Sequence, residues 1–131
     1  MLSSEVGDCR KRTGERFSFR IGEQSGTAVL YCSGRICFRE EARKFSQIAI
    51  DLLRKRNHLV LELSRVRAVD SAGIGELVLV HMQAQACECA VRIVAPTSGV
   101  QNLLELTNVA SLFETFADVE TAIASLAAEM A

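Results

Sequence analysis

The feature that most constrains the fold is an almost unbroken apolar run, His58-Leu59-Val60-Leu61-Glu62-Leu63, set between two stretches of helical spacing. A strand that is apolar at successive positions is typical of a sheet with parallel neighbours, because both of its faces are covered. Before the run, from Phe38 to Arg56, apolar residues recur three and four apart, which predicts a long amphipathic helix. After it, a second helix is expected from Ser71 to about Cys87. Helix, buried strand and helix together predict an α/β layer.

The segment before the first helix predicts a hairpin. Phe17 to Ile21 alternates apolar and polar residues, the stretch from Gly22 to Gly26 is turn-like, and Thr27 to Cys32 is a second apolar run, with Gly34 closing that strand. The sixteen residues before Phe17 are polar and aperiodic. We therefore predict a flexible tail over residues 1–16 and a single domain over residues 17–131.

The remaining elements follow from the same patterns. Val91–Val94 is the next strand, and the strand, helix and strand that end there predict a right-handed crossover. Ser98 to Thr107 repeats helical spacing, and Ser111 to Phe116 predicts a turn and a last edge strand. Asp118 is a good N-cap for a final helix. Its inner face comprises Val119, Ala122, Ile123, Leu126 and Met130. The predicted order is β-β-α-β-α-β-α-(β)-α, a small mixed sheet with helices packed against it.

Composition excludes several classes of function. The net charge of −1 gives no indication of the large basic surface that binds nucleic acid. The sequence contains no run of about 18 apolar residues, so direct insertion into a membrane is not expected. The five cysteines form an odd count without a recurring pair, so reduced packing thiols and a cytoplasmic location are expected. Cys87-x-Cys89 lacks the second ligand pair of a zinc site. We predict no metal and no cofactor.

The chemistry centres on "VDSAGIG", residues 69–75, where Ser71 could attack a substrate, accept a modification or cap a helix. A nucleophile elbow requires G-x-S-x-G, and Val69 occupies the first glycine position. The two histidines are His58, at a strand start, and His81, which lies ten residues along the predicted helix, about 15 Å from its start. A nucleophilic serine needs a base within reach, so no catalytic residue and no enzyme activity are predicted.

Two roles for Ser71 remain, and they are compatible. Asp70 or Ser71 suits an N-cap, and the free N–H groups of a helix start also tolerate a phosphoryl group on the serine. Gly73 and Gly75 would serve either internal packing or the close approach of a partner. The apolar run Leu77-Val78-Leu79-Val80 is explained by burial or by an exposed strip for a partner.

Three stretches resemble the STAS domain, the sulfate-transporter and anti-sigma-antagonist module, and most closely its free-standing bacterial anti-sigma factor antagonists. "LVLELSRVRAVDSAGIGELV" (59–78) resembles the family's strand, loop and D-S-[SA]-G helix start. "SGVQNLLELTNVASLFETFADVETAIASL" (98–126) resembles its C-terminal part, and "TAVLYCSGRI" (27–36) its second strand. The likeness covers nearly the whole chain from about residue 17 to 126.

The resemblance implies a regulatory protein without catalysis that controls transcription by partner switching. In its unphosphorylated form it would sequester an anti-sigma factor, which is also a GHKL-type serine kinase. Phosphorylation of Ser71 would release that partner, and a PP2C-type phosphatase would reset the switch. The expected contact residues are Asp70, Ser71, Ala72, Gly73, Ile74, Gly75, Arg35 and Cys37. The alternative is a non-switching STAS adaptor in a signalling scaffold or lipid-transport complex.

One departure from the family pattern lies after the second strand. Relatives commonly continue as G-[ED]-[LI]-D, whereas this chain has Gly34-Arg35-Ile36-Cys37, so that Cys37 cannot supply the carboxylate. Arg35 adds a positive charge, which could pair with a phosphate on Ser71 or remain simply exposed.

Overall fold

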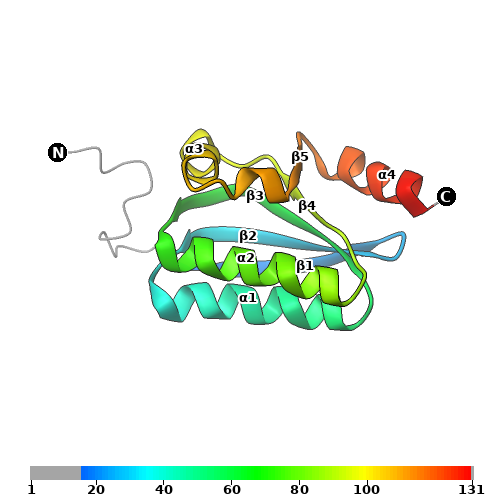
Figure 1. Ribbon diagram of the computed structural model, residues 1–131, viewed down its shortest axis with the longest axis horizontal. Coiled ribbons are helices and arrows are strands. Elements are labelled where there is room, and N and C mark those ends of the chain that lie inside the picture. The colour runs from blue at the N-terminus through cyan, green and yellow to red at the C-terminus, as the bar shows by residue number, and fades with distance from the viewer. Residues whose placement is uncertain (1–15, 131) are drawn as a thin grey trace.

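The computed structural model describes residues 16–130 of the 131-residue chain and contains one five-stranded mixed sheet (Figure 1). The strands lie in the order of the chain, β1-β2-β3-β4-β5. The first pair is antiparallel and every later pair is parallel. The elements are β1 (Ser18–Gln24), β2 (Thr27–Ile36), α1 (Phe38–Arg54), β3 (His58–Val69), α2 (Ser71–Ala86), β4 (Val91–Val94), α3 (Ser98–Leu106), the 3-10 turn η1 (Ala110–Leu112), β5 (Glu114–Phe116) and α4 (Val119–Met130).

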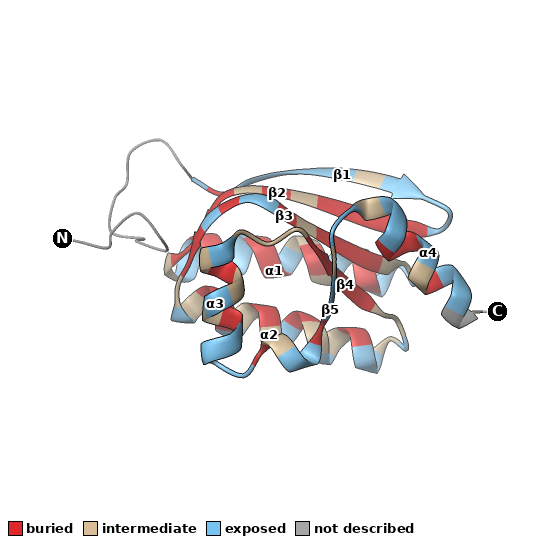
Figure 2. Cartoon of the chain, turned by 90° about the horizontal axis from the view of Figure 1, so that it is seen from above, coloured by how far each residue is buried: buried red, intermediate tan, exposed pale blue. Residues whose placement is uncertain are grey.

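The connections decide how the helices are distributed over the sheet. Each of α1, α2 and α3 joins two neighbouring parallel strands, and crossovers of one hand that proceed in one direction place their helices on one face. These three helices share the larger apolar cluster with strand residues such as Leu30 and Leu61. The smaller cluster holds α4 against Val29, Val60 and Val94, which point the other way. The sheet therefore lies between two helical layers (Figure 2).

The predicted fold class and order of elements are confirmed, and β2 and β3 both extend further than predicted. The second strand passes through Gly34 to Ile36, because Gly34 adopts a φ of 88° and a register shift beside it lets pairing continue. The buried strand continues beyond Leu63 to Val69. Its second half alternates exposed arginines with buried apolar residues, a pattern unlike the continuous run from which the strand was predicted.

The hairpin turn is tighter than predicted. Gln24 already pairs with Thr27, so the turn consists of Ser25 and Gly26. Their φ values are 54° and 77°, as a two-residue hairpin turn of the primed type requires. Apart from Arg16, the predicted tail of residues 1–16 lies outside the described residues, and its boundary with the domain stays a prediction.

The expectation of reduced thiols is met at three positions and is wrong at one. Cys32, Cys87 and Cys89 are free, whereas Cys37 is in a disulfide bond. Between residues 16 and 130, no helix is both long and apolar enough to cross a membrane. Within the same residues, no three side chains of His, Cys, Asp or Glu cluster as they would around a metal ion.

Candidate functional site

The candidate site is the corner where β2 and β3 end and α1 and α2 begin. Parallel strands finish at the same edge of a sheet, so Ile36 and Val69, which are paired in register, bring the two helix starts together. The motif at residues 69–75 lies at this corner, and so do Arg35 and Cys37. The structure thus gathers the predicted site residues from two segments about 35 positions apart in the sequence.

Asp70 organises the corner through both oxygens of its carboxylate. Its Oδ1 accepts a hydrogen bond from the Gly73 N–H at 3.0 Å, which makes Asp70 the N-cap of α2. Its Oδ2 accepts from the Phe38 N–H at 2.8 Å, at the first residue of α1. Phe38 adopts a φ of 59°, a conformation that is unfavourable for a bulky side chain. One carboxylate therefore holds the starts of two helices, of which one begins at a strained residue.

Ser71 follows this cap as the first residue of α2, and its side chain is exposed. Its hydroxyl makes no hydrogen bond with any part of the chain between residues 16 and 130. Since Asp70 supplies the cap, the serine hydroxyl is not needed for that purpose. It stands at the end of the helix where N–H groups and the helix dipole favour negative charge.

The two glycines of the motif differ in what surrounds them. A Cβ atom on Gly73 would collide with the carbonyl oxygen of Ile36 and lie 2.8 Å from the Val69 side chain. Gly73 is therefore required for packing α2 against the end of β2. A Cβ on Gly75 would meet nothing within 4 Å. No internal contact accounts for glycine at that position.

Arg35 and Cys37 lie beneath the corner rather than on its surface. Only 5% of Arg35 is exposed, and its Nη2 lies 3.6 Å from the Glu41 Oε2 of α1. The same carboxylate oxygen accepts the Phe17 N–H at 3.2 Å. Cys37 is fully buried and precedes the first turn of α1. Any effect of these two residues on partner binding must therefore pass through the packing below the helix starts.

The predicted contact residues divide according to burial. Ser71 and Gly75 are exposed, Asp70 and Ala72 are half-buried, and Gly73, Ile74, Arg35 and Cys37 are buried. The apolar run on α2 is partly buried and partly exposed. Leu77 and Val80 are buried, whereas Leu79 is 46% exposed.

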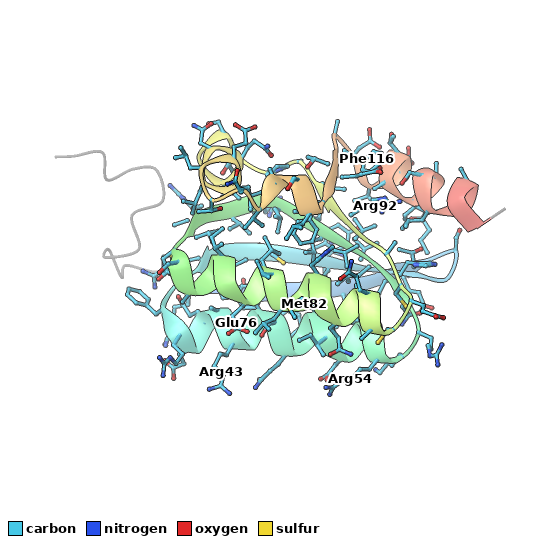
Figure 3. The ribbon with its side chains drawn as sticks, viewed as in Figure 1. Arg43, Arg54, Glu76, Met82, Arg92 and Phe116 are labelled. Atoms are coloured by element: carbon cyan, nitrogen blue, oxygen red, sulfur yellow. The ribbon has the colours of Figure 1, made fainter. Side chains whose placement is uncertain are left out.

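A stripe of exposed small and apolar residues runs along α2 from Ser71. At 100° per residue, five exposed positions fall within one 80° sector of the helix. We call them the α2 stripe: Ser71, Gly75, Leu79, Met82 and Ala86. Met82 is 55% exposed and points outward, while Glu76 faces α1, where its Oε1 accepts the Ser46 hydroxyl at 2.6 Å (Figure 3). Met82 was not among the predicted residues, although its spacing of eleven residues from Ser71 places it on the same side of a helix.

Both histidines are engaged away from Ser71. His58 Nδ1 accepts the Ala90 N–H at 2.9 Å, at the opposite end of β3 from the corner. The His81 ring packs edge-on against Phe113, with 5.5 Å between the ring centres. Neither imidazole is placed to remove a proton from the serine.

Most of the sequence, including all five strands, matches the model of a known family. The family model described as the STAS domain matches residues 18–122. No curated protein sequence matches the chain.

Solved structures share the fold at low sequence identity. An anti-sigma factor antagonist from Mycobacterium paratuberculosis is 19% identical with a TM-score of 0.77, over 87% of this chain and 97% of that one. The Bacillus cell fate determinant SpoIIAA in its phosphorylated form is 14% identical with a TM-score of 0.64, over 82% of this chain and 98% of that one. A segment of the murine anion transporter Slc26a9 is 20% identical with a TM-score of 0.71, over 82% of this chain and 18% of that one.

Proposed function

The chain belongs to the STAS domain family, and from that premise we propose that it is a phosphorylation-switched regulatory protein that sequesters an anti-sigma factor. It would act on transcription by switching partners and would itself catalyse no reaction. The observation that carries the proposal is the exposed Ser71 hydroxyl, which the fold leaves without a hydrogen bond among the described residues.

Phosphorylation at this position would change the surface without unfolding the domain. A phosphoryl group on Ser71 adds about −1.5 to −2 charges at pH 7, at a helix start whose N–H groups favour an anion. The cap is unaffected, because Asp70 and not Ser71 bonds the Gly73 N–H. The added charge would stand at one end of the α2 stripe and repel or desolvate a partner seated there.

Two structures of a protein with a similar fold also support a phosphorylation switch. SpoIIAA, described as an anti-sigma factor antagonist, is known in an unphosphorylated and a phosphorylated form, and both resemble this chain in fold. We extend that property to this chain at Ser71 as part of the proposal.

The α2 stripe is the surface on which we propose that the anti-sigma factor docks. Leu79 and Met82 offer exposed apolar area, and Gly75 leaves room for the backbone of a partner to approach the helix. Asp70, Ala72, Gly73 and Ile74 support this surface from within the same helix start. Arg35 and Cys37 support it from below.

We propose the kinase and the phosphatase from the resemblance to the family. The kinase for Ser71 would be the anti-sigma factor itself, of GHKL type, and a PP2C-type phosphatase would remove the phosphate. We propose a cytoplasmic bacterial protein with no nucleic-acid partner and no direct insertion into a membrane.

Incubation with the cognate kinase and ATP tests the modification, and the chain contains a matched control serine. Ser98 is also exposed and is also the first residue of a helix, where Thr97 Oγ1 accepts the Val100 N–H just as Asp70 accepts that of Gly73. We expect one phosphate on the wild type and on Ser98→Ala, and none on Ser71→Ala, by intact mass. Equal phosphorylation of Ser71→Ala would refute the assignment.

Binding to the anti-sigma factor tests the switch separately. Ser71→Ala should bind the anti-sigma factor as the wild type does, whereas Ser71→Glu should bind at least about tenfold more weakly in calorimetry, because of the charge beside the stripe. Equal affinity of both variants would argue against control through this residue.

One observation favours the second candidate, a non-switching adaptor of a signalling scaffold or lipid-transport complex. The Slc26a9 segment that resembles this chain makes up only 18% of the transporter chain, so the fold also occurs as one part of a longer chain. A pull-down from the source cells that recovers transport components and no kinase would favour the adaptor.

A further inference from the structure

A polar hollow of about 480 Å³ lies on the face of the sheet opposite α1 and α2. The only helix of the described chain on that face, α4, packs against β3, β4 and β5, where it covers Arg92 (Figure 3). On β2, α4 packs near Val29 and Tyr31, and the hollow lies beside it over β1 and the part of β2 from Tyr31 to Ser33. Seven polar residues contribute to the lining: Ser18, Arg20, Tyr31, Ser33, Glu62, Ser64 and Arg65.

The register of the strands brings these side chains together. Arg20 pairs with Tyr31 and Tyr31 with Glu62, so the three lie across one face of neighbouring strands. Ser33 pairs with Arg65, although in a regular strand residues 62 and 65 would point to opposite faces. A register shift between Tyr31 and Ser33 places one extra residue in β3 and turns Arg65 back to the side of Glu62.

The hollow has more hydrogen-bond donors than the chain uses. The Arg20 guanidinium lies 4.0 Å above the centre of the Tyr31 ring, a stacking contact that orients its N–H groups. The side chains of Arg20 and Arg65 and the hydroxyls of Ser18, Ser33 and Tyr31 form no hydrogen bond or ion pair within the described part of the chain. Glu62 is the one acid among the lining residues, and its Oε1 accepts the Ser64 N–H and hydroxyl at 3.3 and 3.1 Å.

We propose that this hollow binds a small organic anion that carries a phosphate or carboxylate group. Two guanidinium groups against one carboxylate leave a local charge of +1, and guanidinium forks match the planar spacing of anionic oxygens. The hydroxyls supply further donors around the same space. The volume lies within the range of small-molecule sites, about 300 to 1,000 Å³.

The site is separate from the Ser71 corner. The hollow is lined by the middle of β3, whereas Ser71 follows the end of that strand at the start of a helix on the other face. Val119, the first residue of α4, forms part of its wall. Binding of an anion in the hollow therefore does not depend on the proposed phosphorylation of Ser71.

Titration of the full chain followed by amide chemical shifts tests the proposal. Inorganic phosphate and citrate are used in separate arms at constant ionic strength, so that the two arms tell the anionic groups apart. We expect saturable shifts at Arg20, Ser33 and Arg65 with at least one anion. Arg20→Gln and Arg65→Gln should each weaken that affinity about tenfold, the loss expected for one charged hydrogen bond.

Arg43→Gln is the matched control, because Arg43 points into solvent from α1 on the other side of the sheet (Figure 3). It should leave the affinity unchanged, and so should Ser71→Ala. Ser33→Ala provides a second test if an arginine variant proves unfolded by circular dichroism. No saturable shift with either anion, or equal weakening by Arg43→Gln and the hollow variants, would overturn the proposal.

Discussion

The Asp70 carboxylate accepts the Phe38 N–H at 2.8 Å, a hydrogen bond that joins residues 32 positions apart and connects the end of β3 to the start of α1. Its other oxygen caps α2, so the residue beside the proposed phosphorylation site also holds two helices in place. The side chain that stabilises both helix starts therefore stands next to the serine that we propose is phosphorylated.

Replacement of Asp70 should lower the free energy of unfolding by the contribution of both hydrogen bonds. We expect Asp70→Ala to lower the free energy of unfolding by about 2 to 4 kcal/mol, because two backbone N–H groups lose an ionised acceptor. Asp70→Asn keeps one acceptor oxygen and should lose about half as much. Urea denaturation monitored by circular dichroism measures both. A loss below about 0.5 kcal/mol for the alanine variant would contradict the double role.

The two motif glycines should respond in opposite directions to alanine. Gly73→Ala should lower the free energy of unfolding by about 3 kcal/mol, because its Cβ collides with the backbone of β2. Gly75→Ala should raise it by about 0.5 to 1 kcal/mol through higher helix propensity, yet weaken binding to the anti-sigma factor. Thermal denaturation and calorimetry separate the effects. Tighter partner binding by Gly75→Ala would remove the argument for close backbone approach.

Charge placed in the α2 stripe should weaken docking without loss of stability. Leu79→Asp and Met82→Asp should each weaken anti-sigma factor binding at least about tenfold, while the free energy of unfolding changes by less than about 0.5 kcal/mol. Leu106→Asp is the control, since Leu106 is 82% exposed at the end of α3, away from the stripe. Surface plasmon resonance measures the affinities. Equal losses for all three variants would indicate a general effect of acidic charge.

Burial of the Cys32 thiol should make the free energy of unfolding depend on pH in the alkaline range. Desolvation in the core raises the pKa of the Cys32 thiol far above its ordinary value of about 9, and the charge of Glu62 adds to the effect. The unfolded chain then releases a proton that the folded protein retains, so the free energy of unfolding falls as pH rises above about 9. Cys32→Ala should lack this contribution, which is at most about 1.4 kcal/mol per pH unit. Denaturation of the wild type and Cys32→Ala between pH 8 and about 10.5 gives the slope of the free energy of unfolding against pH for each protein. Identical slopes would contradict a contribution from Cys32.

The spacing of apolar residues was sufficient to predict the fold, but it did not predict where the strands end. The run at residues 58–63 predicted a buried parallel strand, and Val91–Val94 was predicted with its observed bounds. The extension of β3 to Val69 was missed because Arg65 and Arg67 lie on a part of the sheet face that no described helix covers. Polar residues there are compatible with a strand only once the surrounding helices are known.

The candidate site was predicted in position but not in its internal contacts. The D-S-x-G pattern located a helix start at Ser71, and local spacing allowed a cap by either Asp70 or Ser71. The bond from Phe38 to Asp70 could not be predicted, because it depends on two strands ending side by side. Likewise, the different surroundings of Gly73 and Gly75 depend on the path of β2, which sequence spacing does not report.

The bond between Phe38 and Asp70 also has a consequence for the motions of the protein. The first turns of α1 and α2 share one acceptor, so neither can fray without loosening the other, and the two should open as one local unfolding unit. In native-state hydrogen exchange, the amides of Phe38 and Gly73 should have similar protection, although they lie 35 positions apart in the sequence. A kinase that must draw Ser71 out of its helix would then have to open both helix starts at once.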